Sequence, residues 1–163
     1  MTRRIRFRHA WGPAVLVTLE LLFTPSFALK RPRASKQKIV AQRLVEEAVS
    51  KHPEVAEIEL AVRSSSECST IADSELKGIG EKCDHDELEA MQTGEPFIEK
   101  ESDGFDVTMP LHDSTGKIIG TVGMDFKAEP GQQRSSVVER SRKIVQDVEE
   151  QIPSEARLLE PVD

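Results

Sequence analysis

Two stretches of alternating residues joined by a tight polar turn constrain this fold more than any other feature of the chain. The same side of both stretches is apolar, at Phe105, Val107, Met109, Leu111, Ile118, Val122, Met124 and Phe126. Successive side chains of a β-strand point to opposite faces, so this spacing predicts two strands that are each buried on one face. The turn formers at 113–116 join the two strands into a hairpin.

The other elements are predicted by similar patterns. An apolar helical stripe follows Ser35 and ends before Pro53, and a second stripe, capped by Ser136 and Glu139, ends before Pro153. A capping box formed by residues 84 and 87 begins a short helix that a glycine at 94 ends. Together with the hairpin, the predicted strands cover 55–63, 68–72, 97–101, 105–112 and 117–127.

This order of elements predicts an α+β fold with a five-stranded antiparallel sheet flanked by long N- and C-terminal helices. The two terminal helices would cover the apolar face of the sheet. The segment between residues 73 and 95 would lie on the other face, where a crevice would be the default ligand site. Residues 153–163 are predicted to form a disordered tail.

Residues 1–28 have the features of a secretory signal peptide. Four arginines precede an apolar run, and the small residues at 26–28 suit a cleavage site. The alternative is an uncleaved membrane anchor, which Glu20 inside the apolar run disfavours. We therefore expect a periplasmic or secreted domain after a linker at 29–35, with an N-terminally anchored form that faces the periplasm as the alternative.

The charge and the cysteines limit the partners and the compartment. The chain of 163 residues carries a net charge of −7, and loss of the basic leader would make it more negative. Such a charge argues against nucleic acid as a partner, and against a membrane unless the N-terminal segment stays uncleaved. Cys68 and Cys83 lie about 15 residues apart and predict a disulfide in an oxidising compartment, with two free thiols as the alternative.

The chain resembles the Cache domain, also called the PDC fold, which is a PAS-like extracytoplasmic sensor module of bacterial receptors. The phrases that carry the resemblance are TIADS at 70–74, DHDELEAMQTGEP at 84–96, MPL at 109–111 and GKIIGTVGMDF at 116–126. The resemblance spans about residues 36–152. It implies a PAS-like sheet and binding of a small metabolite such as a carboxylate or an amino acid. No second apolar span follows in this chain, so we expect a stand-alone sensor domain.

Polar residues on the sheet face opposite the apolar one are candidate ligand-binding residues: Arg63, Asp106, Thr108, His112, Thr121 and Asp125. An arginine, a histidine and a hydroxyl can together bind a carboxylate through charge-assisted hydrogen bonds. The alternative is that these residues form the solvated face of an ordinary sheet.

The sequence contains no recognisable catalytic or metal-binding motif. Nucleophile-elbow, zinc-protease and phosphate-loop patterns are absent, and the spacing of Cys68, Cys83 and His85 fits no recognised metal site. The acidic runs on the predicted helices are interpreted as solvated faces. We therefore predict an exported small-molecule-binding domain without catalytic activity, metal or cofactor. The alternative is an interaction module without a ligand, which dimerises or docks on a membrane receptor through its terminal helices.

Overall fold

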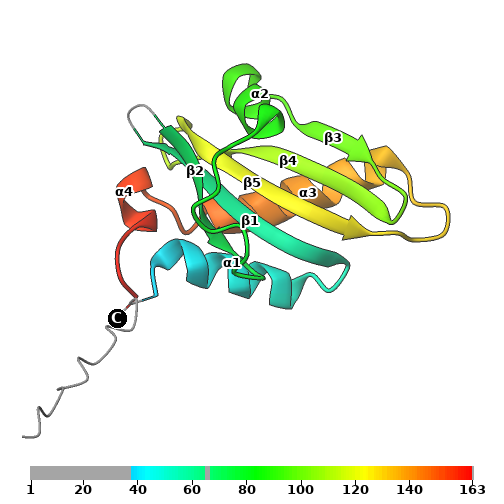
Figure 1. The fold of residues 1–163 in the computed structure, drawn as a ribbon, viewed down its shortest axis with the longest axis horizontal. Helices are drawn as coiled ribbons and strands as arrows, with labels where there is room; N and C mark the ends of the chain where they lie inside the picture. Colours follow the sequence, from blue (N-terminus) through cyan, green and yellow to red (C-terminus); the bar gives the residue numbers. More distant parts are fainter. Residues whose placement is uncertain (1–37, 65–66, 163) are drawn as a thin grey trace, which may run out of the picture. The chain divides into compact units, whose positions relative to one another are not determined.

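The computed structural model describes residues 38–64 and 67–162, so the predicted signal peptide and linker lie outside the described residues. In this described part, nine elements follow one another (Figure 1): α1 (Val40–Lys51), β1 (Val55–Ser64), β2 (Glu67–Asp73), α2 (His85–Thr93), β3 (Phe97–Lys100), β4 (Gly104–His112), β5 (Ile118–Lys127), α3 (Arg134–Glu149) and α4 (Glu155–Leu158). Within these residues, no helix combines the length and the apolar character needed to cross a membrane.

The five strands form one antiparallel sheet in the order β2-β1-β5-β4-β3 (Figure 1). This confirms the predicted α+β class and the five-stranded sheet. β1 pairs with both β2 and β5, although β5 lies more than fifty residues later in the chain. The position of β1 between β2 and β5 brings its polar face beside that of the predicted hairpin.

One face of the sheet forms the core together with α1 and α3. The apolar residues that alternate along β1, β4 and β5 point to this face and meet apolar side chains of both helices. The most deeply buried include Ile58, Leu60, Val107, Leu111, Met124 and Phe126 from the strands and Leu44, Val45 and Ile144 from the helices. This contiguous burial is the main source of stability and determines which face each strand residue occupies.

Two predicted helix caps are wrong. The segment before α1 is extended, because the amide of Val40 donates to Glu160 and that of Val162 donates to Lys38, so helix α1 begins at Val40. α3 begins at Arg134, and the predicted capping box of Ser136 lies inside the helix. The pattern of a serine followed three residues later by a glutamate also fits a helix interior, so it does not fix where a helix begins.

The C-terminal segment is ordered, which corrects the prediction of a disordered tail for residues 153–162. α4 places Leu158 in the core with no exposed surface, and Pro161 forms an isolated bridge with Ile39. One buried leucine and a few main-chain hydrogen bonds hold this segment. Charged residues surround Leu158 in the sequence, so no apolar pattern there predicted a buried segment.

A matched pair of neighbouring leucines tests this docking. We expect Leu158→Ala to lower the free energy of unfolding by about 2–5 kcal/mol, because it removes a buried side chain. Leu159→Ala should change it by less than about 0.5 kcal/mol, because Leu159 is 51% exposed. Urea denaturation of both variants measures the difference, and equal effects would contradict the docking of α4.

The predicted disulfide is present. Cys68 in β2 is bonded to Cys83, and their Cα atoms lie 5.3 Å apart. Main-chain hydrogen bonds from Cys83 to Cys68 and from Thr70 to Glu81 run beside it. The bond therefore fixes the start of α2 to an edge strand of the sheet.

Candidate functional site

A half-open crevice lies on the sheet face opposite α1 and α3, beneath the first turn of α2. Its volume is about 200 Å³. The lining residues come from β1, β4, β5 and the start of α2: Glu57, Glu59, Asp84, Asp86, Glu87, Asp106, Thr108, Gly123, Met124 and Asp125. Seven of these ten residues carry a carboxyl group, and no basic side chain lines the crevice. We refer to this site as the acidic crevice.

Three of these carboxylates lie in a row across adjacent strands. Glu57 of β1 pairs with Asp125 of β5, and Asp125 pairs with Asp106 of β4. Residues that face each other in this way have Cβ atoms about 4.5–5.5 Å apart, so like charges repel each other. Such an arrangement destabilises a sheet, and it is the kind of local conflict that is found at functional sites.

The next row along the sheet forms the floor of the crevice. Glu59, Gly123 and Thr108 occupy facing positions of β1, β5 and β4. A Cβ atom at Gly123 would lie 2.8 Å from Cγ of Glu59, so only glycine lets the Glu59 side chain cross β5. Thr108 is 4% exposed and lines this floor.

The start of α2 supplies the opposite wall. The side chain of Asp84 accepts a hydrogen bond from the amide of Asp86, and the side chain of Glu87 accepts one from the amide of Asp84. This is the predicted capping box, and Gly94 ends the helix as predicted, with a φ of 72°. Ala90 is fully buried where the helix packs against β4 and β5. The box therefore holds two carboxylates above the strand carboxylates.

Burial and mutual repulsion make several of these acids weaker than usual. Burial, followed by a hydrogen bond to Asp84 and the charges of Asp84 and Glu59, raises the pKa of Glu87 to about 8. Burial and then Asp73 raise the pKa of Glu57 to about 7. Burial and then the charge of Asp125 raise the pKa of Asp106 to about 6. The crevice can therefore take up protons near neutral pH and still retain negative charge.

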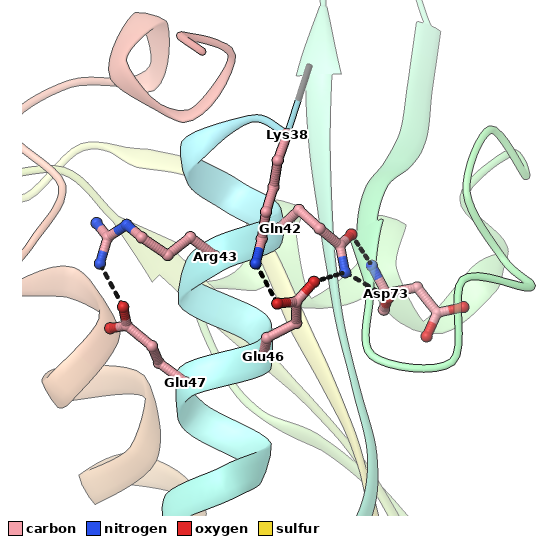
Figure 2. Close-up of polar contacts among 6 residues, drawn as sticks. All are labelled: Lys38, Gln42, Arg43, Glu46, Glu47 and Asp73. Carbon is pink, nitrogen blue, oxygen red and sulfur yellow. Dashed lines mark hydrogen bonds and ion pairs between the residues drawn. The ribbon is translucent and has the colours of Figure 1, made fainter. Parts of the chain in front are cut away.

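Asp73 connects the edge of the crevice to α1. Its side chain accepts hydrogen bonds from the amides of Glu75, Lys77 and Gly78 at 2.7–2.8 Å, which shapes the loop beside Glu57 and Glu59. Figure 2 shows that the side-chain amide of Gln42, in α1, forms hydrogen bonds with the main chain of Asp73. Its Nε2 donates to the carbonyl of Asp73 at 2.9 Å, and its Oε1 accepts from the Asp73 amide at 3.2 Å.

The structure brings together three of the six predicted ligand-binding residues. Asp106, Thr108 and Asp125 line the acidic crevice, whereas Arg63, His112 and Thr121 do not. The predicted trio of arginine, histidine and hydroxyl for a carboxylate therefore does not converge here.

The other three predicted residues have different surroundings. Arg63 is exposed near the far end of β1. His112 is bound to Glu149 of α3, which accepts from its amide at 2.7 Å and lies 2.8 Å from its ring Nδ1. Thr121 is fully buried, and its hydroxyl has no hydrogen-bond partner among the residues that the structure describes.

Sequence analysis missed five carboxylates of the crevice: Glu57, Glu59, Asp84, Asp86 and Glu87. The outward-facing positions of Glu57 and Glu59 on β1 were visible in the alternating pattern. What the pattern lacked was the strand order, because only the pairing of β1 with β5 places these residues beside Asp125. The acids of α2 were interpreted as a solvated face. In the described part of the chain, no three cysteine, histidine or acidic side chains converge closely enough to hold a metal ion.

Comparison with known proteins identifies the fold. No family model and no curated protein sequence matches this chain. Among solved structures, it is similar to a "Putative GAF sensor protein" from Burkholderia vietnamiensis, with a TM-score of 0.55 and 12% identity over 72% of this chain and 77% of that one. It is also similar to the inducer-binding domain of the transcription factor PobR from Acinetobacter, a double mutant solved with 3-hydroxybenzoic acid. That match has a TM-score of 0.50 and 10% identity over 71% of this chain and 96% of that one.

A third similar structure is fRMsr of Staphylococcus aureus in its reduced form. The TM-score is 0.51, with 10% identity over 72% of this chain and 86% of that one. At such identities the likeness shows the fold alone. The chain has a GAF-like, PAS-like fold.

The weak acids of the crevice predict that stability falls as the pH rises. The folded protein holds the protons of Glu57 and Glu87 up to about pH 7 and 8, whereas the unfolded chain releases them near 4.5. Their contribution to the free energy of unfolding is therefore fully present below 4.5 and is lost as the pH rises towards 8. Denaturation with urea at a series of pH values measures this loss.

One substitution assigns this loss to the crevice. Glu87→Gln keeps a side-chain oxygen for the capping bond but cannot ionise, so it should flatten the pH dependence and raise the Tm at pH 8. Glu139→Gln, on an exposed position of α3, should leave the slope unchanged. The same slope in wild type and Glu87→Gln would contradict the assignment.

Proposed function

We propose that this domain binds a small molecule in the acidic crevice and acts as a sensor-type module that converts no substrate. The observation that carries the proposal is the row of facing carboxylates on three adjacent strands, at Glu57, Asp125 and Asp106. Facing like charges destabilise a sheet, and they lie in a concave site on the face away from the core. Binding of a ligand there would offset this repulsion.

The size of the crevice limits the ligand. Its volume of about 200 Å³ is below the 300–1,000 Å³ of pockets for drug-sized molecules. The proposed ligand is therefore a small metabolite, held between the sheet and α2 in a site that already exists without it.

The cellular setting is part of the same proposal. The predicted signal peptide would export the domain, and the Cys68–Cys83 disulfide is consistent with an oxidising compartment. Membership of the Cache family stays a prediction, because the similar structures support the broader GAF-like and PAS-like fold. The proposal of binding without catalysis rests on the lack of a recognisable catalytic motif in the sequence.

A thermal-shift screen of the full-length protein against amines, carboxylates, amino acids and purines tests the proposal. We expect one class to raise the Tm, because a ligand at 100 times its dissociation constant stabilises the folded state by about 2.7 kcal/mol. Thr108→Val, which removes a hydroxyl from the crevice floor without changing its shape, should lower the shift.

Thr121→Val is the matched control. It alters a buried threonine on the same sheet face that does not line the crevice, so the ligand should still raise the Tm of this variant. No shift with any class would favour the alternative of an interaction module. A shift of the same size in Thr108→Val as in the wild type would place binding elsewhere on the protein.

A further inference from the structure

We infer that the acidic crevice binds a small organic cation, an amine that carries one or more ammonium groups, and excludes free carboxylates. The inference rests on the proposed function and specifies its ligand class. It differs from the carboxylate predicted by the sequence, because the basic residues of that prediction lie outside the crevice.

Within residues 38–64 and 67–162, no basic side chain forms an ion pair with a carboxylate of the crevice. The ion pairs among the described residues involve acidic side chains elsewhere: Glu46, Glu47, Glu54, Glu67, Glu75, Glu89, Glu129, Glu149 and Glu160. None of these residues lines the crevice. Partly buried carboxylates without a counter-charge create a strong negative potential in a concave site, which attracts cations and repels anions.

Thr108 points to a ligand independently of the charge. Its exposed fraction is only 4%, and it lines the crevice floor in the row next to the facing carboxylates of Asp106 and Asp125. Among the described residues its hydroxyl has no hydrogen-bond partner, and the oxygen is open to the crevice, where a bound molecule can supply one.

The arrangement of acceptors suits an ammonium group. An ammonium has three hydrogen-bond donors and no acceptor, so it needs several oxygens that approach from different directions. Carboxylates on β1, β4 and β5 and the hydroxyl of Thr108 face the carboxylates of α2 across the crevice. Charge-assisted hydrogen bonds of this kind are about twice as strong as those between neutral groups.

The spread of the carboxylates favours an organic cation over a bare metal ion. They come from four elements and surround a volume of about 200 Å³, and within residues 38–64 and 67–162 no three of them converge on a point. An amine with a carbon chain fills such a volume.

Three four-carbon compounds of matched length test the charge of the ligand: 1,4-diaminobutane, 4-aminobutanoate and butanedioate. We expect the diamine to raise the Tm of the full-length protein by about 5 °C at a saturating concentration. The aminobutanoate should give a smaller rise and the dicarboxylate none. Magnesium and calcium chloride, at the same ionic strength, test for a metal site.

The double variant Asp106→Asn and Asp125→Asn locates the site. It should bind the diamine at least about tenfold more weakly in calorimetry, because it removes two charged acceptors. The variant should also fold, since it removes a pair of facing like charges, and its Tm without ligand checks this directly. Glu139→Gln with Glu150→Gln changes the net charge equally on exposed positions and should bind as wild type does.

Proton release provides a readout that surface binding would not give. A cation next to a protonated carboxyl group favours its ionised form, so binding near pH 7 should release protons from the crevice. Calorimetry in two buffers of different ionisation enthalpy measures the number released. Glu87→Gln should lower this number.

Each outcome separates this inference from the proposed function. Stabilisation by butanedioate and not by the diamine, or by a metal ion alone, would overturn the organic cation and leave a small-molecule site. Equal binding of the diamine to wild type and the Asp106/Asp125 variant would also overturn it. If no compound of the wider screen stabilised the protein either, the proposed function itself would fail.

Discussion

The alternation of side chains along β1, β4 and β5 is the constraint on which both the core and the acidic crevice depend. A shift of one residue in any of these strands would move its apolar side chains into solvent and its carboxylates into the core against α1 and α3. Burial of residues such as Phe126 therefore fixes the register. The same register places Glu57, Asp125 and Asp106 opposite one another. The core in this way enforces an arrangement that electrostatics alone would disfavour.

The crevice tolerates this repulsion because its acids do not all carry charge at once. Glu87 and Glu57, with pKa values of about 8 and 7, can retain protons near neutral pH. The capping box also places Glu87 at the N-terminus of α2, where the helix dipole favours negative charge. Partial protonation and the helix terminus together reduce the cost of the site, and the disulfide holds the start of α2 in place.

Much of the fold could be predicted from the sequence because the alternation of apolar residues along strands and the residues that begin or end helices are local signals. The two strands of the hairpin and the capping box at Asp84 are of this kind. The start of α1 and the docking of Leu158 were mispredicted because both depend on main-chain and side-chain contacts between the two ends of the domain. Only part of the candidate site could be predicted, because the rest also depends on contacts between segments far apart in the sequence. Asp106, Thr108 and Asp125 belong to one hairpin, whereas Glu57 and Glu59 join them only through a long-range pairing.

Gly123 links the identity of two positions that lie far apart in the sequence. The side chain of Glu59 crosses the strand where this residue has no Cβ atom, so any larger residue there would displace the carboxylate from the floor of the crevice. A shorter residue at 59 would in turn leave the space above Gly123 empty. The main chain of β5 therefore sets the size of the side chain that β1 can place in the crevice, since a larger residue at 123 is compatible only with a smaller or displaced one at 59.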